Sequence, residues 1–99
     1  MAFAARKEDG KWRLCKRMGA TFSHVNKHYW PNAEIAFPSQ AKCKACADEL
    51  NETWWKAYDK ASKNAYGKPD PHDPMLWEFV AIIHKHEGLS PAAIKELGI

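Results

Sequence analysis

The residues with the clearest capacity for chemistry are three cysteines, at positions 15, 43 and 46. Cys43 and Cys46 form a C-x₂-C unit, and two thiolates at this spacing can bind one Zn²⁺ with Zn–S distances of about 2.3 Å. Cys15 opens a second stretch, Cys15-Lys-Arg-Met-Gly19, which has the form of a zinc knuckle with Met18 in the second cysteine position. A thioether is neutral and soft and therefore a poor zinc ligand, so a fourth ligand has to come from elsewhere.

Histidines in the segment between the two stretches are the natural source of that ligand. We expect His28 to complete the site, with His24 as the alternative, so that the protein holds one structural zinc in a Cys₃His site. Loss of such a zinc would unfold the N-terminal half, because metal binding contributes to the folding free energy. The alternative is that the cysteines are free, buried and behave as small hydrophobic residues.

A second set of residues has the chemistry of phosphate binding. The first 46 residues hold nine Lys and Arg against three acidic residues, whereas the remainder holds six Lys against nine acidic residues. Basic side chains would contact phosphates, and interleaved aromatic side chains would stack on unpaired bases. Phe22 and Trp30 are instead expected to form a small core over the knuckle. The predicted nucleic-acid-binding residues are Lys11, Arg13, Lys16, Arg17, Lys42 and Lys44.

The acidic second half indicates a different class of function. Trp54 and Trp55 are adjacent on one predicted helix and cannot both face the same core. Leu50, Trp54 and Ala61 share one helix face, which leaves Trp55 directed towards the C-terminal helices or another molecule. With Trp77, it would supply anchors of the kind enriched at protein interfaces. A protein-binding inhibitor or adaptor is therefore the alternative to nucleic-acid binding.

Local signals predict three helices. Apolar spacing and the absence of Gly and Pro predict a long helix over residues 44–66. Asp73-Pro74 combines an N-cap residue with Pro at the first helical position, and this helix is expected to end near Glu87 with Gly88 as its stop. Ser90-Pro91 repeats the same start chemistry for a short last helix.

The N-terminal part has weaker signals. Residues 1–11 are charged and contain Gly10, and we expect them to be a flexible basic arm. Residues 12–31 alternate weakly around Gly19, which predicts a small hairpin or knuckle. The remaining residues, 12–99, form one domain: a module over 12–66 and a C-terminal helical pair over 73–99.

The arrangement of these motifs resembles a known zinc module. Cys15-Lys-Arg-Met-Gly-Ala-Thr-Phe22, followed after about twenty residues by Lys42-Cys-Lys-Ala-Cys46 opening a charged helix, is similar to the treble-clef zinc-binding part of phage recombination endonuclease VII-like and related HNH proteins. The resemblance covers about residues 12–66 and implies zinc on Cys15, Cys43 and Cys46. It also implies a phage or prophage origin and a place in the host cytoplasm.

The resulting fold class is mainly α with a small β element: a treble-clef-like zinc knuckle, a long helix and two C-terminal helices. A chain of 99 residues is too short for a (β/α)₈ barrel, and no apolar run approaches the ~20 residues of a membrane span. We therefore expect a zinc-stabilised nucleic-acid-binding protein, with DNA as the expected ligand, that does not act on a membrane. An HNH-like metal-dependent nuclease is a less favoured alternative, since no catalytic motif accompanies the module.

Overall fold

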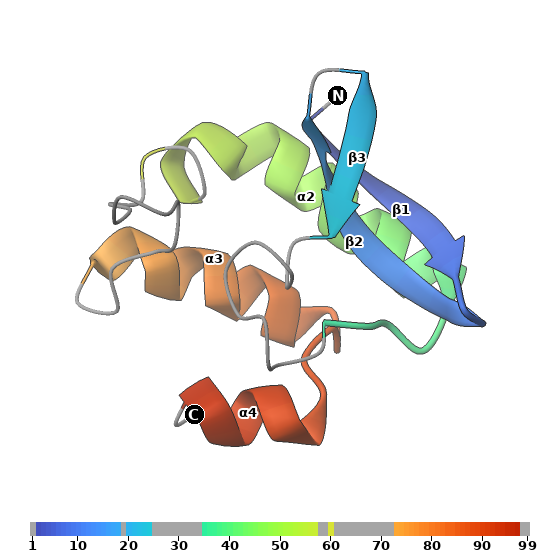
Figure 1. The fold of residues 1–99 in the computed structure, drawn as a ribbon. Helices are drawn as coiled ribbons and strands as arrows, with labels where there is room; N and C mark the ends of the chain where they lie inside the picture. The colour runs from blue at the N-terminus through green and yellow to red at the C-terminus, as the bar shows by residue number, and fades with distance from the viewer. Residues whose placement is uncertain (1, 19, 25–34, 58–59, 61–72, 98–99) are drawn as a thin grey trace.

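The computed structural model describes residues 2–18, 20–24, 35–57, 60 and 73–97. It is a mixed structure, with about half of the described residues in helices and a small antiparallel sheet of strand order β1-β2-β3, so the prediction of helices with a small β element is confirmed, although the fold is less dominated by helix than expected. Figure 1 shows α3 lying between α2 and α4, with the sheet packed on α2. None of the described helices is both long and apolar enough to cross a membrane. The elements are β1 (Phe3–Glu8), β2 (Lys11–Met18), β3 (Thr21–His24), α2 (Gln40–Ala57), α3 (Pro74–Lys85) and α4 (Pro91–Leu97).

The predicted flexible arm over residues 1–11 is wrong, because Phe3–Glu8 form β1 and Phe3 is fully buried. β1 pairs antiparallel with β2. Asp9 and Gly10 connect the strands with φ angles of 52° and 75°. Two successive positive φ angles are the requirement of a type I′ hairpin turn, and Asp-Gly is a preferred sequence for it.

The outer edge of β1 is bound by a side chain of α2. Nδ2 of Asn51 donates to the carbonyl oxygen of Phe3 at 3.0 Å, and Oδ1 of Asn51 accepts from the Phe3 amide at 2.8 Å. The side-chain amide thus satisfies both backbone groups that a further strand would bind at this position. This contact protects the edge at Phe3 from pairing with other chains.

The core lies between the sheet, α2 and α3. The rings of Phe3 and Phe79 meet at a centroid distance of 6.3 Å, a separation typical of favourable aromatic pairs. The buried residues of α3 are Leu76, Phe79, Val80 and Ile83, which follow helical spacing along one face. The buried cluster includes Phe3, Leu14, Ile35, Phe37, Cys43, Cys46, Leu50, Leu76, Phe79, Val80, Ile83 and Leu89.

The predicted helix starts at Asp73 and Ser90 are confirmed. The Asp73 carboxylate accepts from the Met75 amide at 2.8 Å, and Oγ of Ser90 accepts from the Ala93 amide at 3.1 Å. The long helix begins at Gln40, four residues earlier than expected. Oγ of Ser39 accepts from the Lys42 amide at 3.2 Å, which places Ser39 at the N-cap. Of the expected stretch beyond Ala57, the structure describes only residue 60.

The end of α3 differs from the expectation that Gly88 stops the helix. The Gly88 amide donates to the Ile83 carbonyl and the Glu87 amide donates to the His84 carbonyl, both at 2.9 Å. These two bonds define a Schellman motif, whose left-handed residue is usually glycine. Here the left-handed residue is Glu87, with φ of 64°, and Gly88 follows it.

Candidate functional site

The three cysteines lie in two different parts of the fold. Cys43 and Cys46 are three residues apart on α2, so they share one helix face, and both are fully buried in the core cluster. Cys15 is also buried, but it lies in β2 next to Leu14. Because successive side chains of a strand point to opposite faces, Cys15 lies on the sheet face opposite Leu14. Since β2 is extended through Met18, residues 15–18 do not form the expected knuckle turn.

Burial also determines the protonation of the thiols. Burial raises the pKa of Cys43 to about 12, with a smaller increase from the charge on Cys15. Burial is likewise the main cause that raises the pKa of Cys46. Zinc binds the thiolate form, so a zinc ion bound here would have to displace the protons of both thiols.

The described residues by themselves do not fit the predicted zinc site. Among them there is no group of three or more His, Cys, Asp or Glu residues that could hold a metal ion. The proposed fourth ligand, His28, and the side chain of His24 lie outside the described part of the chain. The zinc site and the treble-clef resemblance therefore stay predictions.

The hairpin register creates a second sheet face, opposite the core, on which Cys15 is buried and the residues further from it are partly or fully exposed. Phe3, Ala5, Trp12 and Leu14 contribute to the core or pack against it, so the residues that alternate with them lie on the other face. We call this other face of β1 and β2 the outer sheet face. It comprises Ala4, Arg6, Glu8, Lys11, Arg13, Cys15 and Arg17.

Three of the six predicted nucleic-acid-binding residues lie on the outer sheet face, namely Lys11, Arg13 and Arg17. The other three are separated from them. Lys16 is paired with Phe3 and lies on the core side of the sheet. On α2, Lys42 forms an ion pair with Glu87, and Lys44 forms one with Asp48 at 2.8 Å, so acidic partners offset both charges.

A fourth basic residue, Arg6, joins the outer sheet face through the register and was placed in the arm by sequence reasoning. Arg6 lies directly opposite Arg13. Arg6, Lys11 and Arg17 are exposed and Arg13 is half-buried. The signal that would have found Arg6 is the Asp9-Gly10 turn, which folds residue 6 onto residue 13.

Charged side chains of the outer sheet face affect the pKa of Cys15. Burial raises the pKa of Cys15 and the Glu8 carboxylate raises it further, whereas Arg6 and Arg13 lower it. These side chains therefore lie close enough to act on one thiol. The Arg6–Arg13 pair brings two like charges directly opposite each other, an arrangement that is destabilising unless other groups offset it, and Glu8 lies on the same face.

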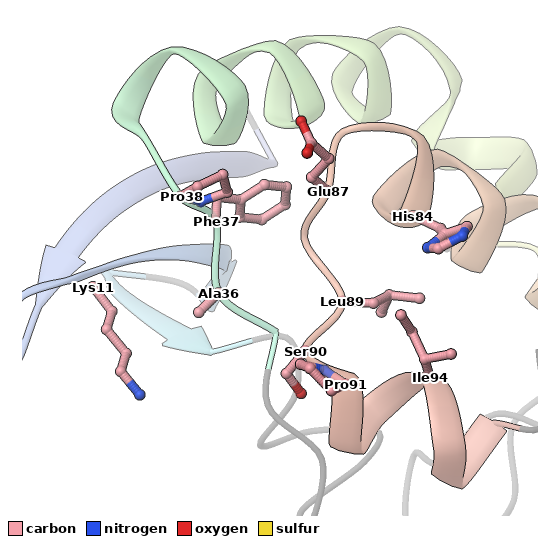
Figure 2. A pocket seen from close by; sticks show the side chains of 10 residues that line it. All are labelled: Lys11, Ala36, Phe37, Pro38, His84, Glu87, Leu89, Ser90, Pro91 and Ile94. Atoms are coloured by element: carbon pink, nitrogen blue, oxygen red, sulfur yellow. The ribbon is translucent and has the colours of Figure 1, made fainter.

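A cavity of about 580 Å³ adjoins this face. The segment just before α2 forms one wall and joins β2 to the loop after α3. The Phe37 amide donates to the Trp12 carbonyl at 2.9 Å, and the Ala36 amide donates to the Gly88 carbonyl at 3.0 Å. Figure 2 shows Lys11 on the sheet side of the cavity, with His84 and Ile94 across from it. The lining residues are Lys11, Ala36, Phe37, Pro38, His84, Glu87, Leu89, Ser90, Pro91 and Ile94.

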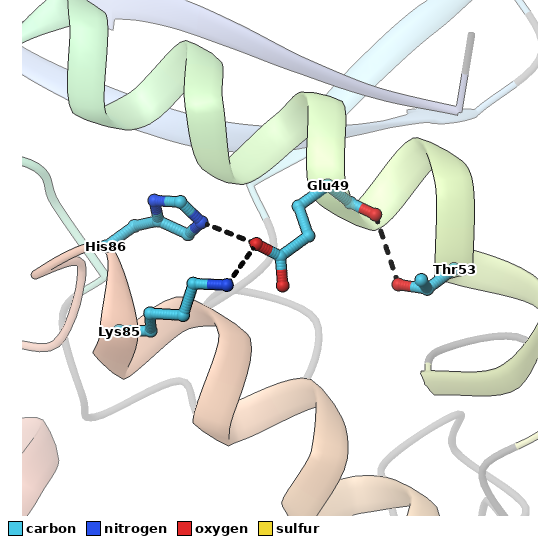
Figure 3. A network of polar contacts seen from close by, with 4 residues as sticks. All are labelled: Glu49, Thr53, Lys85 and His86. Atoms are coloured by element: carbon cyan, nitrogen blue, oxygen red, sulfur yellow. Dashed lines mark hydrogen bonds and ion pairs between the residues drawn. The ribbon is translucent and has the colours of Figure 1, made fainter.

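A polar network joins α2 to the end of α3 (Figure 3). One carboxylate oxygen of Glu49 lies 2.6 Å from Nζ of Lys85 and 3.0 Å from Nε2 of His86. Oγ1 of Thr53 donates to the Glu49 carbonyl at 3.1 Å. His84 faces the cavity whereas His86 contacts Glu49, so these two histidines do not share a site.

The aromatic residues expected at a surface have different positions. Trp77 on α3 is 40% exposed, and it is the large hydrophobic residue that stands out at the described surface. Trp54 packs against the core, and the side chain of Trp55 lies outside the description. Trp12 also packs against the core rather than lying among the arginines.

Comparison of the chain with protein-family models, with curated proteins and with solved structures gives no significant match. The site is therefore interpreted from its own geometry and charge.

Proposed function

We propose that this protein binds nucleic acid through the outer sheet face, without catalysing a reaction on it. The observation that carries the proposal is the direct cross-strand pairing of Arg6 with Arg13, with Lys11 and Arg17 on the same face. Arginine matches phosphate oxygens with a planar fork of donors. A row of arginines held by strand pairing therefore suits a phosphate backbone.

Rigidity supports this proposal. The Asp9-Gly10 turn closes one end of the hairpin, and the Asn51 amide binds the β1 backbone at the other end. The four basic residues are thus held on one face by backbone hydrogen bonds. Less conformational freedom is lost on binding when the contact residues are held in place beforehand.

The expected affinity is strongly dependent on salt. Each phosphate that a protein neutralises on B-form DNA contributes a slope of about −0.9 to a plot of log K against log salt concentration. With Arg6, Lys11, Arg13 and Arg17 in contact, the slope would be roughly −3 to −4. The proposed binding requires the positive charge and the hydrogen-bond donors of the outer sheet face and includes no catalytic step.

Fluorescence anisotropy with labelled oligonucleotides tests the proposal. The variant Arg6→Gln/Arg17→Gln removes two charges from the outer sheet face, whereas Lys44→Gln/Lys95→Gln removes two charges elsewhere. We expect the first variant to weaken binding about tenfold or more and to reduce the salt slope by about two, and the second to change affinity about twofold or less. Equal losses in both variants, or no binding at low salt, would contradict the proposal.

The exposure of Trp77 supports a second candidate, binding of a protein partner through the C-terminal helices. Exposed tryptophans are frequent anchors in protein interfaces. Such binding would be lost in Trp77→Ala and retained in Arg6→Gln/Arg17→Gln. Nucleic-acid binding should show the opposite pattern, so the same two variants separate the two functions.

A further inference from the structure

One residue joins the outer sheet face to the cavity of Figure 2. Lys11 is the first residue of β2, lies on the outer sheet face, and also lines the cavity. A ligand bound along the arginines would therefore share Lys11 with the cavity. The cavity is in this sense continuous with the proposed nucleic-acid interface.

The charges around the cavity determine how a nucleotide would lie in it. Lys11 stands on the sheet side, whereas the carboxylate of Glu87 is on the side of α3 and is paired with Lys42. Phosphates are attracted to Lys11, whereas the charge of Glu87 is offset by Lys42. A strand that follows the sheet would therefore keep its backbone on the Lys11 side and direct only an uncharged part into the cavity.

The cavity has the size and walls that a nucleobase requires. Its volume of about 580 Å³ lies within the ~300–1,000 Å³ range of small-molecule sites, which are lined mainly by apolar side chains. The apolar walls come from three parts of the chain, the segment before α2, the loop after α3 and α4. They are Ala36, Phe37, Pro38, Leu89, Pro91 and Ile94.

The polar groups of the lining match the edge of a base. Oγ of Ser90 accepts a hydrogen bond from the Ala93 amide, which leaves its hydroxyl hydrogen for a ligand acceptor. The Glu87 carboxylate is directed towards α2 in Figure 2 and is paired with Lys42, so it is not among the groups that face a base. The exposed ring of His84 offers a further nitrogen.

We propose that the cavity binds one unpaired nucleobase of a single strand whose phosphates lie along the outer sheet face. This inference rests on the proposed function and names its substrate class, single-stranded nucleic acid. Apolar contact with the base would add affinity beyond the phosphate contacts, as it does in other single-strand-binding proteins.

The test compares oligonucleotides that differ only in their bases. A labelled single-stranded 12-mer, the same 12-mer with abasic sites at its central positions, and the corresponding duplex are titrated by anisotropy at one salt concentration. We expect the intact single strand to bind about tenfold more tightly than the abasic strand. In amide NMR spectra of the unaltered protein, the intact strand should shift Ala36, Leu89 and Ser90, and the abasic strand should not.

The outcomes separate this inference from the proposed function. Equal affinity for intact and abasic strands, with the salt dependence retained, would overturn base binding and leave phosphate binding standing. Absence of binding by every oligonucleotide at low salt would overturn both. A nucleoside monophosphate that binds as tightly as the 12-mer would assign the cavity to free nucleotides and overturn the single-strand claim.

In His84→Ala, we expect a reduced preference for the intact strand with unchanged affinity for the abasic strand.

Discussion

Gly88 and Phe37 pack so closely that any side chain on Gly88 would overlap the Phe37 ring. A Cβ atom at this position would also lie 2.9 Å from Cγ2 of Ile83, a distance that real Cβ contacts do not show. Glycine is therefore required at position 88 by the close approach of two chain segments. The carbonyl of the same residue accepts from the Ala36 amide at 3.0 Å, so this contact holds one wall of the cavity.

Gly88→Ala should destabilise the protein by about 1–3 kcal/mol, because overpacking a filled core displaces neighbouring groups. Denaturant unfolding measures the change in the free energy of unfolding. In a Phe37→Leu background the same substitution should cost less, since the ring that it meets is absent. A Gly88→Ala variant as stable as the parent protein would contradict the close packing.

The conformation of Glu87 provides a second prediction. Glu87 has φ of 64°, a left-handed conformation that costs a residue with a Cβ about 1 kcal/mol or more. Glu87→Gly and Glu87→Ala both remove the ion pair with Lys42, but only glycine relieves the backbone strain. We expect the Gly variant to be about 1 kcal/mol more stable than the Ala variant in thermal or denaturant unfolding. Equal stabilities would show that the left-handed conformation is not adopted in solution.

The network around Glu49 predicts a dependence of stability on pH. The hydrogen bond from Lys85, followed by that from His86, lowers the pKa of Glu49, while burial opposes the shift. A carboxyl group with a lowered pKa stabilises the fold above its unfolded pKa, near 4.5, and this contribution is lost as pH falls through the folded value. Glu49→Gln should therefore lose less stability between about pH 5 and pH 3 than the parent protein. Parallel curves for the two proteins in this range would contradict the network.

The buried thiols give a further test. With the pKa of Cys43 raised to about 12, its reaction with an alkylating reagent at pH 8 should be slow in the native protein and rapid in denaturant. At alkaline pH, Cys43 makes the stability of the fold fall as pH rises, which is the opposite of the dependence expected from Glu49. A raised thiol pKa contributes stability below the usual value of 9.0, and this contribution is lost as pH rises towards 12.

Metal analysis of protein purified without chelator tests the predicted zinc site. About one zinc per chain, absent in Cys43→Ser, would confirm zinc binding at these thiols. Folded protein without zinc would contradict the predicted site and leave the cysteines as small core residues.

Elements with local signals were predictable. Asp73 and Ser90 each accept a hydrogen bond from an amide of the first turn that follows, and such caps depend on a few neighbouring residues. The strand Phe3–Glu8 was not predictable in this way. Its apolar face amounts to Phe3 and Ala5, a weak period-2 signal, and it is stabilised by pairing with β2 and by Asn51, which lies 48 residues further along the chain.

In the candidate site, too, some features were predictable from the sequence and others depend on the tertiary structure. The sequence by itself determined that the basic residues gather in the first half of the chain, that Cys43 and Cys46 form a C-x₂-C unit, and that two helices begin at Asp73 and Ser90. Only the tertiary structure decided that Arg6 lies opposite Arg13, that Lys16 lies on the other face of the sheet, and that Cys15 lies in β2 outside the buried cluster that holds Cys43 and Cys46. The reason is that one residue of register reverses the face of every side chain in a strand, and register is determined by pairing between segments rather than by composition.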